Sequence, residues 1–502
     1  MSDLLPSVWQ LRAGYGAVRA ALPWLDASAY PGEPPAFGAF AKPADLPVAA
    51  AMAATHELAG RVARLRREGA LQLARYSPAA SGPLEEMGAL LAELAETRVP
   101  FVVLHTDVPF PRIRALADAH PRLNVVIESG PRKILYFFRE VQELLAPRPN
   151  LFLSTYNLCN WLGLERLAES RLGQRLLFGT HAPAFSPDAA MGPIVMGRLP
   201  WETKCDIAGN TLRRLLGIPE ERPPEVPWAP PAPFIIDAHG HCLTPGTKRT
   251  YNFPTPDEEA SFTPKDWTDF LDSIAVEMLF VAPGESLLDT RRPAREGCRH
   301  LLEAAPARFR YFVVFDPRLG DEHTQTTEEA LKDPLCVGVK IHPSMHGTPA
   351  DDDSYGPMYE LALRADKPVL THSWEVSSYN ATQHLSHPDR FRKHLEQHPG
   401  VRLVLAHAGG RPSTFEAVAA ICRDFAGVQV DLAGDYFDSG LLDALAERIG
   451  PRRILFASDV DWIDPRCNLG PALASGLSDE DLLLILRDNA MRTYGVARAS
   501  CP

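Results

Sequence analysis

The sequence predicts an α/β protein in which a (β/α)8 barrel follows a degenerate, barrel-like copy of itself. Two observations carry this prediction. In the second half of the chain, short apolar runs alternate with helix-like stretches, an alternation typical of parallel βαβ units. In addition, several segments of the first half recur in the second half in the same order, as expected of a duplicated chain.

A proline-rich segment separates the two halves. The stretch "IPEERPPEVPWAPPAPF" at 218–234 contains seven prolines. Proline at that density cannot continue a helix or fill a central strand, and it stiffens a connector. We therefore expect a degenerate domain at 1–217, a linker at 218–233 and a catalytic barrel at 234–502. A proline-rich loop within one domain is the alternative.

The second half contains eight candidate strands, one for each unit of a barrel. Helix-like stretches such as "DRFRKHLEQHP" and "FEAVAAICRDF" lie between them, and about 250 residues is the usual length of such a barrel. An open, doubly wound sheet is the alternative fold. The expected strands are 234–238, 274–281, 310–315, 336–342, 368–372, 402–407, 427–432 and 453–458.

Four pairs of segments connect the halves at offsets of 267 to 279 residues. A steady offset in the same order indicates two related units. The pairs are "RVPFVVLHTD" with "DKPVLTHSW", "HPRLNVVIESG" with "HPGVRLVLAHAG", "QRLLFGTHAP" with "RRILFASDVD", and "GNTLRRLLGI" with "DNAMRTYGV".

The bulk composition is that of a soluble globular protein. A formal charge of −12 argues against nucleic acid or an anionic membrane as the main partner. The chain begins without a signal-peptide pattern, and no apolar run approaches the length of a membrane span. The eight cysteines include no CxxC pair, which favours reduced thiols over disulfides or a zinc ribbon. We expect a soluble, cytoplasmic protein.

Polar side chains follow five of the eight expected strands. In such a barrel the chemistry lies at the carboxyl ends of the strands. Residues i and i+2 of a strand point to the same face, so the H-x-H pair sends two imidazoles inward. Neutral imidazoles with a carboxylate are ligands that zinc prefers. The strand-end residues are His239, His241, Lys340, His342, His372, His407 and Asp459.

The motifs "IIDAHGH", "GVKIHP", "PVLTHSW", "LVLAHAGG", "ILFASDVDW" and "DNAMRTYGV" resemble, in order, those of the amidohydrolase superfamily. The chain looks most like its amidohydrolase-related branch of metal-dependent hydrolases and decarboxylases. This resemblance implies one divalent metal, usually zinc, and a neighbouring acid/base or electrophile, His407. The implied ligands are His239, His241, His372 and Asp459. The chain departs from the common pattern after strand 8, where "VDW" replaces a frequent Tyr-Pro pair, and this difference bears on the substrate pocket.

The charges of these groups imply a mechanism. A divalent cation can lower the pKa of a bound water to about 7 and polarise a carbonyl. Asp459 is the natural base for that water, and His407 can stabilise an oxyanion or donate a proton. By resemblance, Lys340 is either a carbamylated bridge in a binuclear centre or, as we prefer, a substrate contact or structural residue. His342 is a ligand of a second metal ion, a substrate contact or a plain strand-end residue.

Three further residues are candidate substrate contacts. Arg411 follows the glycine pair of "HAGGRPS" and could hold a substrate carboxylate through its planar fork, or be a solvated loop charge. Trp374 and Trp462 line the pocket or pack in the core.

The first half retains few of the expected ligands. His105 is kept, but other residue types stand at the remaining positions, so we expect no catalytic zinc there and a structural role in packing on the catalytic unit. A different site built on Glu128 and His181 is the alternative, and further association of copies is left open. The replacements are Glu128 for His407, His181 for Asp459, Arg75 for Lys340, Ser77 for His342 and, in the weakest match, Ser28 and Tyr30 for the H-x-H pair.

Three functions are compatible with the sequence. The first is metal-dependent hydrolysis of an ester, amide or lactone-like bond in a small molecule. The second is non-oxidative decarboxylation of a small aromatic or unsaturated acid with the same ligands. The third is a catalytically silent binding module, against which the complete ligand set of the second half argues.

Overall fold

The computed structural model describes residues 2–28, 35–37, 39–41, 46–129, 134–242 and 262–496. The chain forms two compact units. The barrel unit contains, of these, residues 2–14, 229–242 and 262–496, and the first unit lies within 15–228. The change of unit at 228 falls in the proline-rich segment. The first residues of the chain belong to the barrel unit because Arg12 binds Leu473 O (3.2 Å), Ser475 O (3.0 Å) and Asp479 (2.7 Å).

The barrel unit is built around eight parallel strands in sequential order. All eight strands expected from the sequence are present. A bridge between Gly240 and Val460 joins the first strand to the segment that follows the last one, and Asp459 N donates to His239 O at 2.9 Å. The sheet is therefore a nearly closed barrel. The strands are β7 (Ile235–Gly240), β8 (Val276–Val281), β9 (Phe309–Val314), β10 (Cys336–Ile341), β11 (Val369–Thr371), β12 (Leu403–Leu405), β13 (Val428–Asp431) and β14 (Ile454–Leu455).

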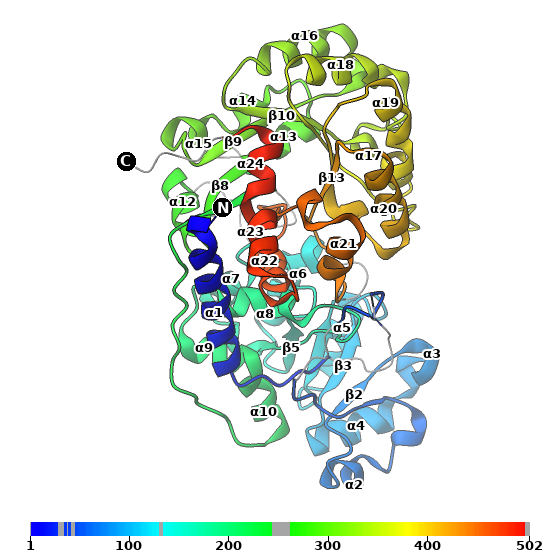
Figure 1. Cartoon of the computed structure of the whole chain (residues 1–502). Helices are drawn as coiled ribbons and strands as arrows, with labels where there is room; N and C mark the ends of the chain where they lie inside the picture. The colour runs from blue at the N-terminus through cyan, green and yellow to red at the C-terminus, as the bar shows by residue number, and fades with distance from the viewer. Residues whose placement is uncertain are drawn as a thin grey trace. The chain divides into compact units, whose positions relative to one another are not determined.

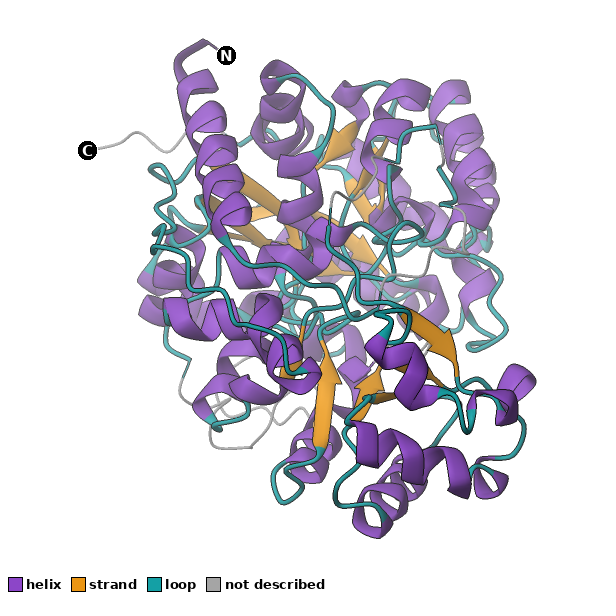
Figure 2. Cartoon of the chain, turned by 90° about the horizontal axis from the view of Figure 1, so that it is seen from below, coloured by secondary structure: helices purple, strands orange, loops and turns teal. Residues whose placement is uncertain are grey.

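Helices follow the strands and cover the outside of the barrel (Figures 1 and 2). Their apolar faces pack on strands that are almost entirely buried, as expected of a parallel sheet covered by helices. The helices are α12 (Pro264–Asp272), α13 (Gly284–Leu288), α14 (Ala294–Gly297), α15 (Arg299–Ala304), α16 (Gly320–Ala330), α17 (Pro343–His346), α18 (Gly356–Arg364), α19 (Arg392–Gln397), α20 (Phe415–Asp424), α21 (Leu441–Ile449), α22 (Pro465–Ala474), α23 (Asp479–Leu483) and α24 (Asn489–Tyr494).

The first unit has a smaller parallel sheet. Its six described strands are also in sequential order, and a parallel bridge joins Asp26 to Val48 ahead of them. A core cluster that includes Leu73, Val102 and Val126 fills one side of this sheet. The strands are β1 (Ala51–Ala53), β2 (Leu73–Arg75), β3 (Phe101–Leu104), β4 (Val125–Glu128), β5 (Leu151–Ser154) and β6 (Leu176–Leu177).

The helices of the first unit alternate with its strands. They are α2 (Val62–Arg67), α3 (Pro78–Ser81), α4 (Gly88–Thr97), α5 (Phe110–Ala119), α6 (Phe138–Leu145), α7 (Gly163–Glu169), α8 (Pro187–Val195), α9 (Trp201–Cys205) and α10 (Thr211–Leu216). The helix that precedes them, α1 (Leu5–Ala21), belongs to the barrel unit up to Gly14 and to the first unit from Tyr15.

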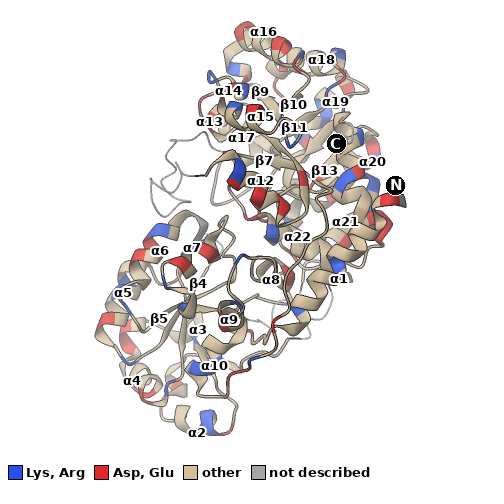
Figure 3. Cartoon of the chain, turned by 90° about the vertical axis from the view of Figure 1, so that its left-hand side faces the viewer, with Lys and Arg blue, Asp and Glu red and all other residues tan. Residues whose placement is uncertain are grey.

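Acidic and basic residues are interspersed along the outer helices (Figure 3). The seven cysteines within the described ranges are buried thiols. None of the helices described is long and apolar enough to cross a membrane.

Candidate metal centre

Three of the predicted ligands converge at the carboxyl ends of the first and last barrel strands. His239 lies on β7, His241 follows that strand, and Asp459 follows β14. One potential ligand atom of each lies within 4.8 Å of the other two. His241 Nε2 is 2.8 Å and His239 Nε2 is 3.6 Å from Asp459 Oδ1. The H-x-H pair thus places both imidazoles on one face, as its spacing predicts.

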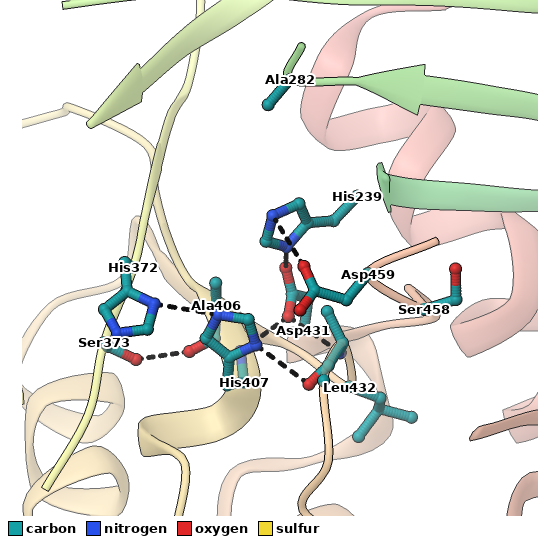
Figure 4. Close-up of polar contacts among 12 residues, drawn as sticks. His239, Ala282, His372, Ser373, Ala406, His407, Asp431, Leu432, Ser458 and Asp459 are labelled. Atoms are coloured by element: carbon teal, nitrogen blue, oxygen red, sulfur yellow. Dashed lines mark hydrogen bonds and ion pairs between the residues drawn. The ribbon is translucent and has the colours of Figure 1, made fainter. Parts of the chain in front are cut away.

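The Nδ1 atoms of the two histidines are hydrogen-bonded to oxygen atoms of the protein. His239 Nδ1 lies 3.1 Å from Asp431 Oδ2, and His241 Nδ1 lies 2.7 Å from the carbonyl oxygen of Ala282. Carboxylate and carbonyl oxygens only accept, so each Nδ1 carries a proton, and each Nε2 is the ring nitrogen left to bind a metal ion. Figure 4 shows the ring of His239 facing the carboxylates of Asp431 and Asp459.

The carboxylate of the cluster also fits a metal ion. Asp459 Oδ1 is buried and faces the Nε2 atoms of both histidines. Two imidazole nitrogens and a carboxylate oxygen that converge in this way match the donor set of a divalent cation such as zinc. Burial lowers the pKa of His239 to about 3, so this ligand is neutral. Burial would raise the pKa of Asp459, but the nearby histidines, His241 first, hold it well below its usual value.

Lys340 lies at the same cluster. Its Nζ is 2.9 Å from His239 Nε2, and its side chain is buried. Burial lowers the pKa of Lys340 to about 8. Lys340 therefore contacts the His239 nitrogen that a metal ion would bind, so its side chain belongs to the candidate metal centre.

His372 lies beside the cluster of His239, His241 and Asp459, but its ring nitrogens contact other residues. Its Nδ1 is 3.1 Å from His407 Nε2, and its Nε2 is 2.8 Å from Gln383 Oε1. The rings of His239 and His407 are 5.5 Å apart. Both residues are adjacent to the cluster. The roles of His372 as a metal ligand and of His407 as an acid/base stay predictions.

A stack of planar groups extends outward from His372. The rings of His342 and Trp374 each stack on the ring of His372, with centroid distances of 4.0 Å and 5.5 Å. The guanidinium of Arg411 covers Trp374 at 4.6 Å, and its Nη1 donates to Asp435 at 3.0 Å. Part of the Arg411 fork is thus held by the protein's own carboxylate.

Trp462 is half-buried, and its backbone N–H donates to Asp459 O at 2.8 Å. Trp462 therefore lies in the same turn as Asp459, next to the candidate metal centre. Contact of Trp462, Trp374 or Arg411 with a substrate stays a prediction.

The loops at the centre adopt left-handed backbone conformations. His407 has φ +63° and Asp459 has φ +70°. Such values are uncommon for residues other than glycine and concentrate at functional sites. Gly434 makes room for His407, because a Cβ on this glycine would lie 2.7 Å from His407 Nδ1.

Two residues of the site were missed by the sequence analysis. Asp431 ends the seventh barrel strand, β13, and binds His239. The rule that polar residues at the carboxyl ends of the strands form the site would have found it. Gln383 binds His372 from the middle of the following loop, where the sequence carries no signal of that contact.

The strand ends of the first unit hold a different arrangement. Arg75 donates to Glu128 at 2.6 and 2.9 Å, and His181 Nε2 lies 3.2 Å from the same carboxylate. His105 Nδ1 lies 3.3 Å from the carbonyl oxygen of Glu128. Among the residues that the structure describes, His239, His241 and Asp459 are the one group positioned to hold a metal ion. Tyr30, the weakest of the predicted replacements, lies outside those residues.

The Glu128 pair should make the first unit sensitive to acid. Burial would raise the pKa of Glu128, but Arg75 and His181 outweigh it and lower the pKa from 4.5 to about 2. A depressed folded-state pKa means that this stabilisation is complete above pH 4.5 and is lost as the pH falls toward 2. We expect Glu128→Gln to flatten the acid-unfolding curve of the first unit in that window, as measured by circular dichroism. An unchanged curve would contradict this account.

A parallel barrel with a His-His-Asp cluster at the carboxyl ends of its strands is an architecture of metal-dependent enzymes. The family model described as "Amidohydrolase" matches residues 236–496, more than half of the chain. The chain belongs to the amidohydrolase family.

Solved structures with a similar fold cover about half of this chain and nearly all of their own. A 2,6-dihydroxybenzoate decarboxylase from Rhizobium is 16% identical, with a TM-score of 0.43, over 52% of this chain and 99% of its own. A 5-carboxyvanillate decarboxylase from Sphingomonas paucimobilis is 13% identical, with a TM-score of 0.41, over 53% and 99%. A dihydroxybenzoic acid decarboxylase from Polaromonas, solved with manganese and 2-nitroresorcinol, is 18% identical, with a TM-score of 0.39, over 53% and 98%. No curated protein matches the chain in sequence.

Proposed function

We propose that the barrel unit is a metal-dependent hydrolase that cleaves an ester, amide or lactone-like bond of a small molecule by means of an activated water. This proposal rests on the convergence of His239, His241 and Asp459, in which the Nδ1 atom of each histidine is bound to an oxygen and the Nε2 atom is left as the ligand. A divalent ion held by these residues, with His372 as the expected fourth ligand, supplies the Lewis acidity that activates water at neutral pH and polarises the substrate carbonyl.

Each nearby residue has a role in this proposal. Asp459 is ionised at neutral pH, so it can take the proton of the attacking water and return it to the leaving group. His407 lies within reach of His372 and supports the developing oxyanion or donates a proton. Lys340 and the stack of His342, Trp374 and Arg411 line the substrate side of the centre.

Removal of the metal tests the role of the cluster. Dialysis against a chelator should abolish turnover, and added zinc should restore it; manganese is the alternative ion, because one of the structurally similar decarboxylases was solved with manganese. Activity is measured on a panel of esters, amides, lactones and carboxylic acids. Full turnover by chelator-treated protein whose metal content has been shown to be zero would refute the proposal.

Decarboxylation is the second candidate function. Lys340 and His407, two groups that can carry a proton, lie beside the triad, and loss of carbon dioxide needs a proton donor to the remaining carbon. Product analysis separates the two reactions. Release of carbon dioxide from an aromatic or unsaturated acid, with no hydrolysis of the other substrates, would replace hydrolysis by decarboxylation.

We further propose that the chain is a tandem duplication whose first unit is non-catalytic and structural. Equivalent hydrogen bonds support this proposal. In each unit a buried aspartate accepts from the backbone N–H two residues ahead and from a hydroxyl after the last strand. These trios are Asp26, Ser28 and Thr180 in the first unit and Asp237, His239 and Ser458 in the barrel unit.

The carboxyl-terminal parts of the two units also correspond. A π-helical turn follows the last strand of each, at Asp206–Asn210 and Leu484–Asp488. His181 and Asp459 both have a left-handed backbone. These matches support the alignment in which Ser28 stands for His239 and His181 for Asp459.

A further inference from the structure

Asp431 makes three hydrogen bonds that join separate parts of the metal centre. It is the last residue of β13 and is fully buried. Its Oδ2 lies 3.1 Å from His239 Nδ1, and its Oδ1 accepts from the backbone N–H groups of His407 at 2.8 Å and Ala433 at 3.0 Å. Figure 4 shows Asp431 between His239 and His407.

These bonds set both the chemistry and the geometry of the site. Because a carboxylate only accepts, its contact with His239 keeps the proton on Nδ1 and directs the Nε2 lone pair toward His241 and Asp459. The bond to the N–H of His407 holds that residue in its left-handed conformation. A single side chain thus fixes the orientation of a ligand and the turn that carries the neighbouring histidine.

The first unit provides an internal comparison. Ser154 ends β5, which lies between β4 and β6 as β13 lies between β12 and β14. Ser154 Oγ accepts from the N–H two residues ahead at 3.3 Å, as Asp431 Oδ1 does. A Cβ at Gly179 would collide with the hydroxyls of both Ser154 and Ser28, so these two serines border the same glycine. Where serine stands for His239, serine also stands for Asp431.

We propose that Asp431 is the positioning residue of the metal centre, which holds His239 in the ligating tautomer and couples it to His407. This inference rests on the proposed metal site and adds a specific residue to it.

Metal affinity tests the proposal directly. Asp431→Asn should weaken the binding of Zn²⁺ by 10- to 100-fold, the usual cost of losing the partner of a ligating histidine, as measured by competition with a chromophoric chelator. The visible spectrum of the Co²⁺-substituted protein should change as well, since the orientation of a ligand changes. Asp316→Asn is the matched control, because Asp316 is also a buried aspartate that follows a barrel strand but binds Arg318 and Thr290 instead. Wild-type affinity and an unchanged Co²⁺ spectrum in Asp431→Asn would overturn the proposal.

Thermal unfolding of the metal-free protein gives a second test that does not need the ion. His239→Ser leaves Asp431 Oδ2 without its imidazole donor, so the further change Asp431→Ser should lower the melting temperature less in that background than in the wild type. An equal decrease in both backgrounds would overturn the coupling. If the wild-type protein binds no divalent ion, the proposed function and this inference fail together. If Asp431→Asn binds as the wild type does, only this inference fails.

Discussion

Replacement of Asp459 by asparagine should lower kcat by about three orders of magnitude. Proton transfer by a positioned group contributes roughly 10²- to 10⁴-fold to a rate, and asparagine cannot accept the proton of the attacking water. Asparagine also carries no charge to balance the ion, so the metal content should fall as well. The measurement is kcat on the substrate found by the panel, at a metal concentration that saturates both proteins.

The control for this variant is Asp316→Asn, which removes a buried carboxylate from the end of another barrel strand and should retain its metal and most of its activity. An Asp459→Asn protein with wild-type kcat would exclude Asp459 as the base. A protein that keeps its metal but loses turnover would separate the proton-transfer role from the ligand role.

Replacement of Arg75 by methionine should have the largest effect on stability. The change leaves Glu128 charged and fully buried without its main partner, and breaking a buried pair on one side costs about 3–5 kcal/mol. The free energy of unfolding of the first unit should decrease by that amount in a urea titration, while the metal content of the chain stays the same.

Two further variants test the reason for this loss. Arg148→Met removes a contact with Asp118, whose side chain is half exposed, and should lower the stability much less, because solvent screens an exposed ion pair. Arg75→Met combined with Glu128→Gln removes both charges and should recover much of the stability. Equal losses in Arg75→Met and Arg148→Met would contradict the assignment of Arg75 and Glu128 as a buried structural pair.

The sequence predicted the barrel and the convergence of its first and last strand ends for a physical reason. The period of two along a strand determines which residues share a face, and the parallel order brings all carboxyl ends to one side. Spacing and order therefore placed His239, His241 and Asp459 at one end of the barrel, and the resemblance to the amidohydrolase superfamily singled them out as ligands.

Other parts of the site depend on contacts that spacing does not determine. Gln383 reaches His372 from a loop, and a loop conformation is not given by periodicity. Arg75 and Glu128 were interpreted only as replacements of Lys340 and His407. Their bidentate pair joins β2 to β4 across β3 and depends on side-chain reach. Asp431 was predictable by the same rule as the other strand ends.

The metal content of the purified chain tests the central claim most directly. It should be measured by elemental analysis on protein prepared without added metal and again after addition of zinc, for the wild type and for His239→Ala and Asp459→Asn. The account predicts one divalent ion per wild-type chain and a marked loss in both variants. Two ions per chain would indicate a binuclear centre with a carbamylated Lys340 or a metal site in the first unit. No bound ion in the wild type, even after zinc is added, would contradict the account.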